Sequence, residues 1–121
     1  MSGTIQLPTI IRNSAISLEE LGIKEVAWKW EDAQAVIQFL KQNDLAILGG
    51  DVYRVEHNQK EPTYDSWYID RKSGMAWSDY VDECQKITMS YINNYYLKNG
   101  ANYCYSLVYA KKALIKKIKP S

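Results

Sequence analysis

Three aspartates in the middle of the chain are the residues whose type could do chemistry. Asp51, Asp65 and Asp70 all lie within residues 51–70. Two carboxylates that share a pocket can act as general acid and general base, as they do in glycoside hydrolysis. Strand spacing does not show that these three converge, and aspartate is common in turns because its side chain hydrogen-bonds the local backbone. A small hydrolase is therefore one hypothesis, which requires two of these acids to meet in a pocket.

Other patterns of catalysis or ligand binding are missing from the sequence. His57 is the only histidine, and it lies in a polar stretch without a recognisable serine or cysteine nucleophile. A catalytic triad or a metal site built on several histidines is therefore disfavoured. The run Gly49-Gly50-Asp51 matches neither GxxxxGK[ST] nor a GxGxxG that opens a helix. We expect no metal and no cofactor, and we interpret His57 as a surface residue.

The glycine pair has a structural interpretation. Gly49 and Gly50 separate residues 45–48 from residues 51–55, and both runs have the composition and length of strands. Two glycines could form a tight hairpin turn, or a bulge that bends one continuous strand. The flanking runs are short for a hairpin, so we favour the bend. In this interpretation the glycines relieve a steric problem in the backbone, and Asp51 hydrogen-bonds the local turn.

Apolar periodicity predicts two main helices and a short one. Residues 30–43 place one set of side chains on a single helical side: Trp30, Ala33, Val36, Ile37 and Leu40. Residues 78–100 carry a wider stripe: Tyr80, Val81, Cys84, Ile87, Thr88, Tyr91, Ile92 and Tyr95. We expect Ser78 to cap this helix and Gly100 to end it. Residues 17–22 are typical of a short helix, with Ser17 as its cap, Glu20 completing a capping box and Gly22 as its stop.

Two more strands are predicted, at residues 64–70 and 102–110, and residues 56–63 read as a polar loop broken by Pro62. In the first strand Trp67 and Ile69 share one face. Its other face carries Tyr64, Ser66, Tyr68 and Asp70. The second strand can be covered on both faces, which suits a strand with neighbours on each side. Residues 111–121 form either a final edge strand or a frayed tail.

This order of elements predicts one α+β domain over residues 1–121, with a mainly antiparallel sheet that carries its helices mostly on one face. The length suits a single compact domain. No apolar run is long enough to cross a bilayer and the N-terminus does not resemble a signal peptide, so we expect a cytoplasmic protein and no membrane partner. Cys84 and Cys104 are widely spaced, which predicts reduced thiols in the core.

Charge is distributed unevenly along the chain. Residues 1–110 hold 10 of the 15 Lys and Arg and all 14 Asp and Glu, a balance of −4, and the other five lysines lie in residues 111–121. A lysine-rich end near tyrosines raises the alternative of a small nucleic-acid-binding module. Without arginine, and on an acidic body, such a run is more typical of a solvated terminus.

Aromatic and acidic side chains in the middle of the chain suggest a protein-binding surface. Tyr64, Tyr68 and Asp70 share one strand face, and Asp51 and Tyr53 share a face of a neighbouring strand. Tyrosine is a common interface anchor, and acids steer a basic partner. Whether the two faces coincide depends on strand register. Our predicted partner-binding residues are Asp51, Tyr53, Tyr64, Asp65, Tyr68 and Asp70.

Longer stretches carry a family resemblance. The run "SLEELGIKEVAWKWEDAQAVIQFLKQNDLAILGGDVYRV", then "YDSWYIDR" and a helix opening "WSDYV", resembles bacterial immunity proteins of polymorphic toxin systems, and specifically the immunity protein 40 family. The resemblance covers roughly residues 17–110, and "AILGGDVY" with "WYIDR" is its most distinctive part. It does not identify contact residues.

This resemblance implies a small cytosolic protein, encoded beside a cognate toxin, that binds and neutralises that toxin without enzymatic activity of its own. We expect it to occlude the active site of the toxin. A nuclease is a candidate toxin, because enzymes that act on nucleic acid tend to have positive clefts that an acidic patch can complement.

Overall fold

The computed structural model of the protein describes residues 6–112. The elements run α1 (Thr9–Ser14), β1 (Ile16–Ser17), the 3-10 helix η1 (Glu19–Leu21), β2 (Val26–Lys29), α2 (Trp30–Gln42), β3 (Ala46–Glu56), β4 (Gln59–Tyr68), α3 (Trp77–Asn99), β5 (Tyr103–Ser106) and β6 (Val108–Ala110). This arrangement confirms the predicted α+β fold class. Residues 113–121 lie outside the described residues, and with them three of the five lysines behind the nucleic-acid alternative, Lys116, Lys117 and Lys119.

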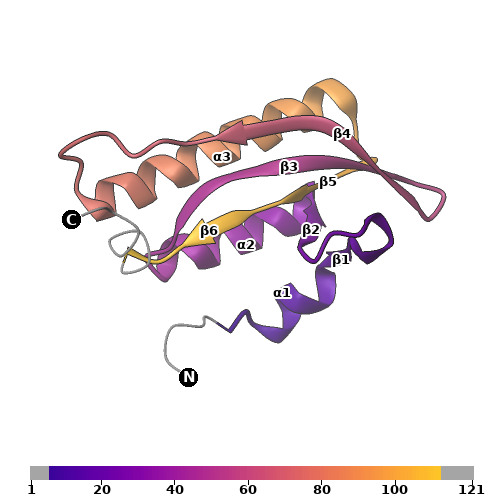
Figure 1. The fold of residues 1–121 in the computed structure, drawn as a ribbon, viewed down its shortest axis with the longest axis horizontal. Helices are drawn as coiled ribbons and strands as arrows, with labels where there is room; N and C mark the ends of the chain where they lie inside the picture. The colour runs from indigo at the N-terminus through magenta and orange to yellow at the C-terminus, as the bar shows by residue number, and fades with distance from the viewer. Residues whose placement is uncertain (1–5, 113–121) are drawn as a thin grey trace.

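Within the described range, six strands form one antiparallel sheet. Its order is β1-β2-β5-β3-β4, and β6 continues the line of β5 and pairs with β3. The long strand β3 lies between these partners on one side and the edge strand β4 on the other. Helices α2 and α3 lie side by side along the sheet, and the tip of the β3–β4 hairpin projects past the C-terminal end of α3 (Figure 1).

The two faces of the sheet are covered to different extents. The main core lies between the helices and one face, where Val52, Trp67 and Tyr105 pack with buried residues of α2 and α3. Their strand neighbours Tyr53 and Cys104 point the other way, because side chains alternate along a strand. They form a smaller core with Leu18 and Ala27. Residues 16–23 therefore cover part of the second face, at the end nearer the hairpin.

The two main helices are confirmed, with small corrections. Helix α3 begins at Trp77, with Ala76 as its N-cap and no side-chain capping bond, so the prediction of Ser78 as the cap was wrong. Ile87 was expected in the core but is 39% exposed. It lies beside a shallow depression lined only by residues of α3, so no other described element covers it there.

The short helix predicted at residues 17–22 is a single 3-10 turn. Ile16 and Ser17 pair with β2, which leaves only Glu19–Leu21 for the turn. Leu18 is the N-cap of this turn and no side chain caps it, so the predicted cap at Ser17 was wrong, although the Ser17 hydroxyl accepts the N–H of Glu19. Gly22 ends the turn at φ +76, as predicted. The predicted capping box was also wrong: Glu20 makes no capping bond, and its carboxylate lies 3.5 Å from the ammonium of Lys60 on β4.

Strand β3 is continuous through the glycine pair, which excludes the hairpin turn, and its pairing with β6 shifts register between Ile47 and Gly49, in agreement with the predicted bulge. A Cβ built on Gly49 would lie 2.2 Å from the Trp67 carbonyl oxygen, and one on Gly50 would lie 2.0 Å from the Ser106 carbonyl oxygen. The neighbouring backbones approach so closely that only glycine fits. The predicted turn at Asp51 was wrong: Asp51 is a strand residue whose N–H donates to the Ser106 hydroxyl at 3.1 Å.

The loop predicted at residues 56–63 was also wrong. Strand β4 begins at Gln59, and only His57 and Asn58 form the turn, both with left-handed φ, +54 and +64. Two left-handed residues are the signature of a tight type I′ hairpin. Pro62 is tolerated because β4 is an edge strand, where a missing N–H breaks no ladder. Polar side chains line both faces here because the hairpin extends beyond the helices.

Residues 102–110 form two strands that meet at Leu107. Both faces are covered from Cys104 to Leu107, as predicted, while Val108 is 38% exposed. Helix α1 and strand β2 were not predicted. Trp28 of β2 is fully enclosed, and its indole N–H donates to the Ile11 carbonyl of α1 at 3.0 Å, which ties the two elements together.

The two thiols are free and buried, as expected. Burial raises the pKa of Cys84 to about 11 and that of Cys104 to about 12, so both stay protonated at neutral pH. Because the thiolate is the reactive form, we expect neither to react with an aromatic disulfide reagent in the native protein. Both should react within seconds in concentrated guanidinium chloride, which absorbance of the released thiolate measures. Rapid labelling of the native protein would contradict this.

Candidate functional site

Strand register decides which of the six predicted residues meet. The β3–β4 pairing places Asp51 opposite Ser66 and Gly49 opposite Tyr68, while Gly50 lies opposite Trp67. Trp67 points into the main core. Asp51 and Tyr68 therefore lie together on the face away from the helices, since side chains alternate across a strand and paired residues share a face.

Tyr53 shares that face but is not accessible. It is 5% exposed, because residues 16–23 cover it together with Cys104. Burial, and then the nearby carboxylates of Asp51 and Glu25, raise the pKa of its hydroxyl. Tyr53 is therefore part of the smaller core and not of the exposed surface.

Tyr64 and Asp65 lie in a bulge of β4, apart from Asp51 and Tyr68. The β3–β4 register shifts between Asp51 and Tyr53, so residues 63–65 all lie opposite Val52. The Thr63 hydroxyl stabilises the bulge: it donates to the Val52 carbonyl at 2.9 Å and accepts the N–H of Asp65 at 3.1 Å. Tyr64 adopts a left-handed φ of +69 and is 89% exposed.

Asp65 is turned toward the helices, where its carboxylate accepts a hydrogen bond from the Tyr95 hydroxyl of α3 at 2.8 Å. Asp70 follows the end of β4 and is exposed. The three aspartates thus lie at separate places, which counts against the hypothesis of a hydrolase with paired carboxylates.

The contact between Tyr95 and Asp65 leads to a prediction at alkaline pH. Burial, and then the hydrogen bond to Asp65, raise the pKa of Tyr95 from 10.0 to about 12. A raised pKa means that the folded state holds the proton more tightly, so the stabilisation is complete below pH 10 and is lost as pH rises through 12. Urea unfolding followed across this range should show a smaller loss of stability in Tyr95→Phe than in the wild type. Identical pH dependence would contradict this.

A shallow hollow of about 340 Å³ opens beside Asp51 and Tyr68. Its lining comes from β3, β4 and β6: Leu48, Gly49, Gly50, Asp51, Ser66, Trp67, Tyr68 and Val108. Sequence reasoning missed Leu48 and Val108 as surface residues, because nothing local shows that β6 pairs with this part of β3. The exposed Tyr68 ring, at 78%, and the exposed Asp51 carboxylate border the hollow.

A comparison with models of known protein families shows which family the chain belongs to. The family model described as Immunity protein 40 matches residues 17–109. The chain belongs to the Immunity protein 40 family. The matched region contains the hollow, the bulge and all six predicted residues of this Immunity protein 40 member. Searches of curated proteins and of solved structures returned no match.

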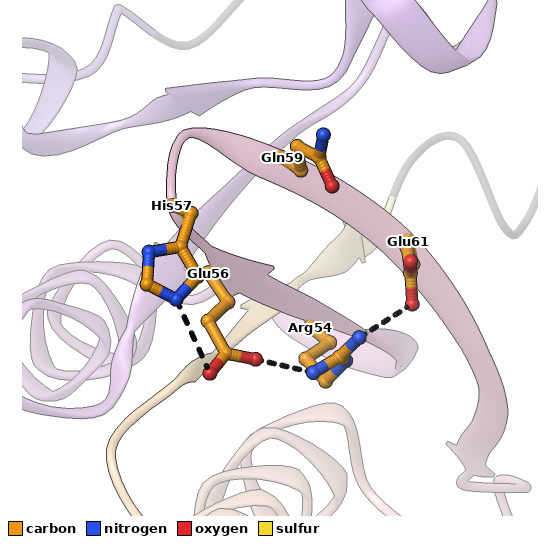
Figure 2. Close-up of a pocket in the computed structure, with 5 residues that line it drawn as sticks. All are labelled: Arg54, Glu56, His57, Gln59 and Glu61. Atoms are coloured by element: carbon orange, nitrogen blue, oxygen red, sulfur yellow. Dashed lines mark hydrogen bonds and ion pairs between the residues drawn. The ribbon is translucent and has the colours of Figure 1, made fainter.

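A second, smaller pocket of about 80 Å³ lies at the hairpin end of this Immunity protein 40 member. Figure 2 shows the Glu56 carboxylate between His57 and Arg54, with Glu61 on the other side of the guanidinium. Arg54 donates to Glu56 and, at 3.0 Å, to Glu61. The hydrogen bond that Arg54 donates to Glu61, and then the charges of both acids, raise the pKa of Arg54. One guanidinium faces two carboxylates here, so this pocket keeps one net negative charge while His57 is neutral. His57 is 88% exposed, as predicted.

Residues 6–112 of this Immunity protein 40 member contain no group of three or more His, Cys, Asp and Glu side chains that could hold a metal ion. Among the helices of that range, none has the length and apolar character that a membrane crossing requires. The hollow itself is bordered by one exposed aromatic ring, Tyr68, and one exposed carboxylate, Asp51.

Proposed function

We propose that this member of the Immunity protein 40 family binds a cognate bacterial toxin in the cytoplasm and neutralises it without chemistry of its own. The sheet face around Asp51 and Tyr68 makes the contact. The observation that carries the proposal is family membership over residues 17–109, together with an uncovered face inside the matched region.

The composition of this face supports protein binding. Tyr68, Tyr64 and Val108 are exposed by 78%, 89% and 38%, although apolar side chains of this size are more often buried. Tyrosine supplies a large contact area at little entropic cost. Tyr68 and Val108 stand on paired strands, so little ordering of these two is needed on binding, and more of the interaction energy appears as affinity.

Charge supports one kind of toxin. Asp51 is exposed on this face and Asp70 is exposed just after the end of β4, and within residues 6–112 neither carboxylate forms an ion pair. An acidic surface associates fastest with a basic one. We propose that the protein occludes the positive cleft of a toxin that acts on nucleic acid, with Asp51, Tyr64, Tyr68 and Asp70 in contact and with Tyr53 and Asp65 holding the backbone beneath them.

Growth rescue tests this function. The toxin encoded beside this protein is expressed alone and together with it, and wild-type protein should restore growth and co-elute with the toxin. Tyr68→Ala should weaken rescue because it removes the largest exposed ring at the hollow. Leu97→Ala is the matched control, since Leu97 is 80% exposed on α3, in the helix layer. Failure of the wild-type protein to rescue growth would overturn the proposal.

A further inference from the structure

We infer that the hollow over Gly49 receives one arginine side chain of the toxin, which stacks on Tyr68 and pairs with Asp51. This inference rests on the proposed function, because it names the chemistry that the toxin must present to that surface. It would also give the acidic face a defined anchor point.

The hollow follows from a row of three residues across three strands. Gly49 of β3 lies opposite Tyr68 of β4 on one side and opposite Val108 of β6 on the other. Side chains on neighbouring strands normally fill such a row. Here the central position has no side chain, and none can be added because a Cβ would lie 2.2 Å from the Trp67 carbonyl oxygen. The gap between Tyr68 and Val108 is therefore a permanent feature of the backbone.

One wall of the hollow carries a free charge. Asp51 lies two residues beyond Gly49 on the same strand, so its side chain points to the same face. Its carboxylate makes no hydrogen bond and no ion pair within the described part of the chain, since the contacts of Asp51 with Ser106 are made by its backbone. Ser66 lies directly opposite Asp51 and is also exposed. A negative, hydrogen-bond-accepting wall thus faces an apolar floor.

Arginine fits this combination better than other side chains do. Its planar guanidinium stacks on an aromatic face and donates paired hydrogen bonds to a carboxylate. Its methylene stem can lie along apolar surface, which Leu48 and Val108 provide. An acidic side chain would be repelled by Asp51, and an apolar one would leave that carboxylate desolvated without a partner.

The first test measures the affinity for the cognate toxin by calorimetry. Asp51→Asn and Tyr68→Leu should each weaken binding by about tenfold or more, as expected for a central interface anchor. Asp44→Asn is the charge-matched control, because Asp44 is an exposed loop residue whose left-handed φ of +61 asparagine also accepts. The loss in Asp51→Asn should shrink as salt is raised.

This experiment distinguishes a failure of the proposed function from a failure of the arginine inference. If the wild-type protein does not bind the toxin, the proposed function is wrong. If the wild-type protein binds and Asp51→Asn binds as tightly as Asp44→Asn, the proposed function stands and the arginine anchor is wrong. If the free protein is a dimer that Tyr68→Leu dissociates, a second copy of this chain occupies the hollow and the inference is wrong.

The second test needs no toxin. Amide resonances of the isotopically labelled protein are followed while N-acetyl-arginine amide is added, with N-acetyl-citrulline amide as the neutral isostere. We expect shifts centred on Gly49, Gly50 and Val108 with the arginine compound, and their loss in Asp51→Asn. Equal shifts with the citrulline compound, or shifts scattered over the helices, would overturn the inference.

Discussion

Gly50→Ala should lower the free energy of unfolding by about 3 kcal/mol, at the upper end of what overpacking costs. The added methyl carbon would lie 2.0 Å from the Ser106 carbonyl oxygen and 2.5 Å from the Trp67 ring. A ring can shift, but the carbonyl belongs to the backbone of β5, so β3 and β5 must separate where they hold the sheet together. Urea unfolding followed by tryptophan fluorescence measures the loss.

A matched glycine separates steric effects from conformational ones. Gly74 has a φ of +78 and nothing within 4 Å of a built Cβ. Gly74→Ala therefore carries only the cost of a left-handed alanine, about 1 kcal/mol. Equal losses in the two variants would show that crowding at Gly50 is not the cause. The bend in β3 would then need another explanation.

Trp67→Ala should cost about 3 to 5 kcal/mol, as large-to-small changes of buried aromatic residues do. The Trp67 ring is 8% exposed and stacks on Tyr91 of α3 with ring centres 4.7 Å apart. Its indole N–H donates to the Thr88 hydroxyl at 3.1 Å, deep in the core. Removal of Trp67 therefore leaves both a cavity and a buried hydroxyl that has lost its donor.

Two further variants show how much of this loss in stability comes from the hydrogen bond between Trp67 and Thr88. Trp67→Phe keeps a ring but loses the indole N–H, and Thr88→Val removes the hydroxyl partner while keeping a similar shape. If the hydrogen bond contributes, the double variant should be more stable than the sum of the two single losses predicts. A Trp67→Ala protein that unfolds at the same urea concentration as the wild type would contradict the assigned role of Trp67 in joining β4 to α3.

The predicted partner-binding set shows how far local reasoning reaches. Alternation along residues 64–70 correctly separated Trp67 from Tyr68, because that period is a property of the extended backbone itself. The same rule places Asp65 on the face of Trp67, and its carboxylate does lie toward Tyr95 of α3, so its inclusion in the partner-binding set does not follow from the alternation. The bulge that shifts the β3–β4 register at residues 63–65 was not predicted. Nothing in the residues 63–65 by themselves marks the interruption.

Burial of one strand face was equally beyond local reasoning. The sequence places Tyr53 and Asp51 on the same strand face, and both were predicted to bind the partner. In the structure Tyr53 is only 5% exposed, whereas Asp51 is exposed. The difference comes from residues 16–23, which lie over Tyr53 and end before they reach Asp51. The segment that covers a strand is decided by the packing of the whole chain. The sequence of the strand alone does not predict it.

The sequence alone therefore determined the features that depend on near neighbours: the two long helices, the facing of Trp67 and Tyr68, the bend at the glycine pair and the family resemblance. Only the tertiary structure decided the features that depend on pairing between distant strands. These are the bulge at residues 63–65, the cover over Tyr53 and the row Tyr68, Gly49 and Val108 that forms the hollow. Register is set by packing across the sheet, and a shift of one residue reverses every face.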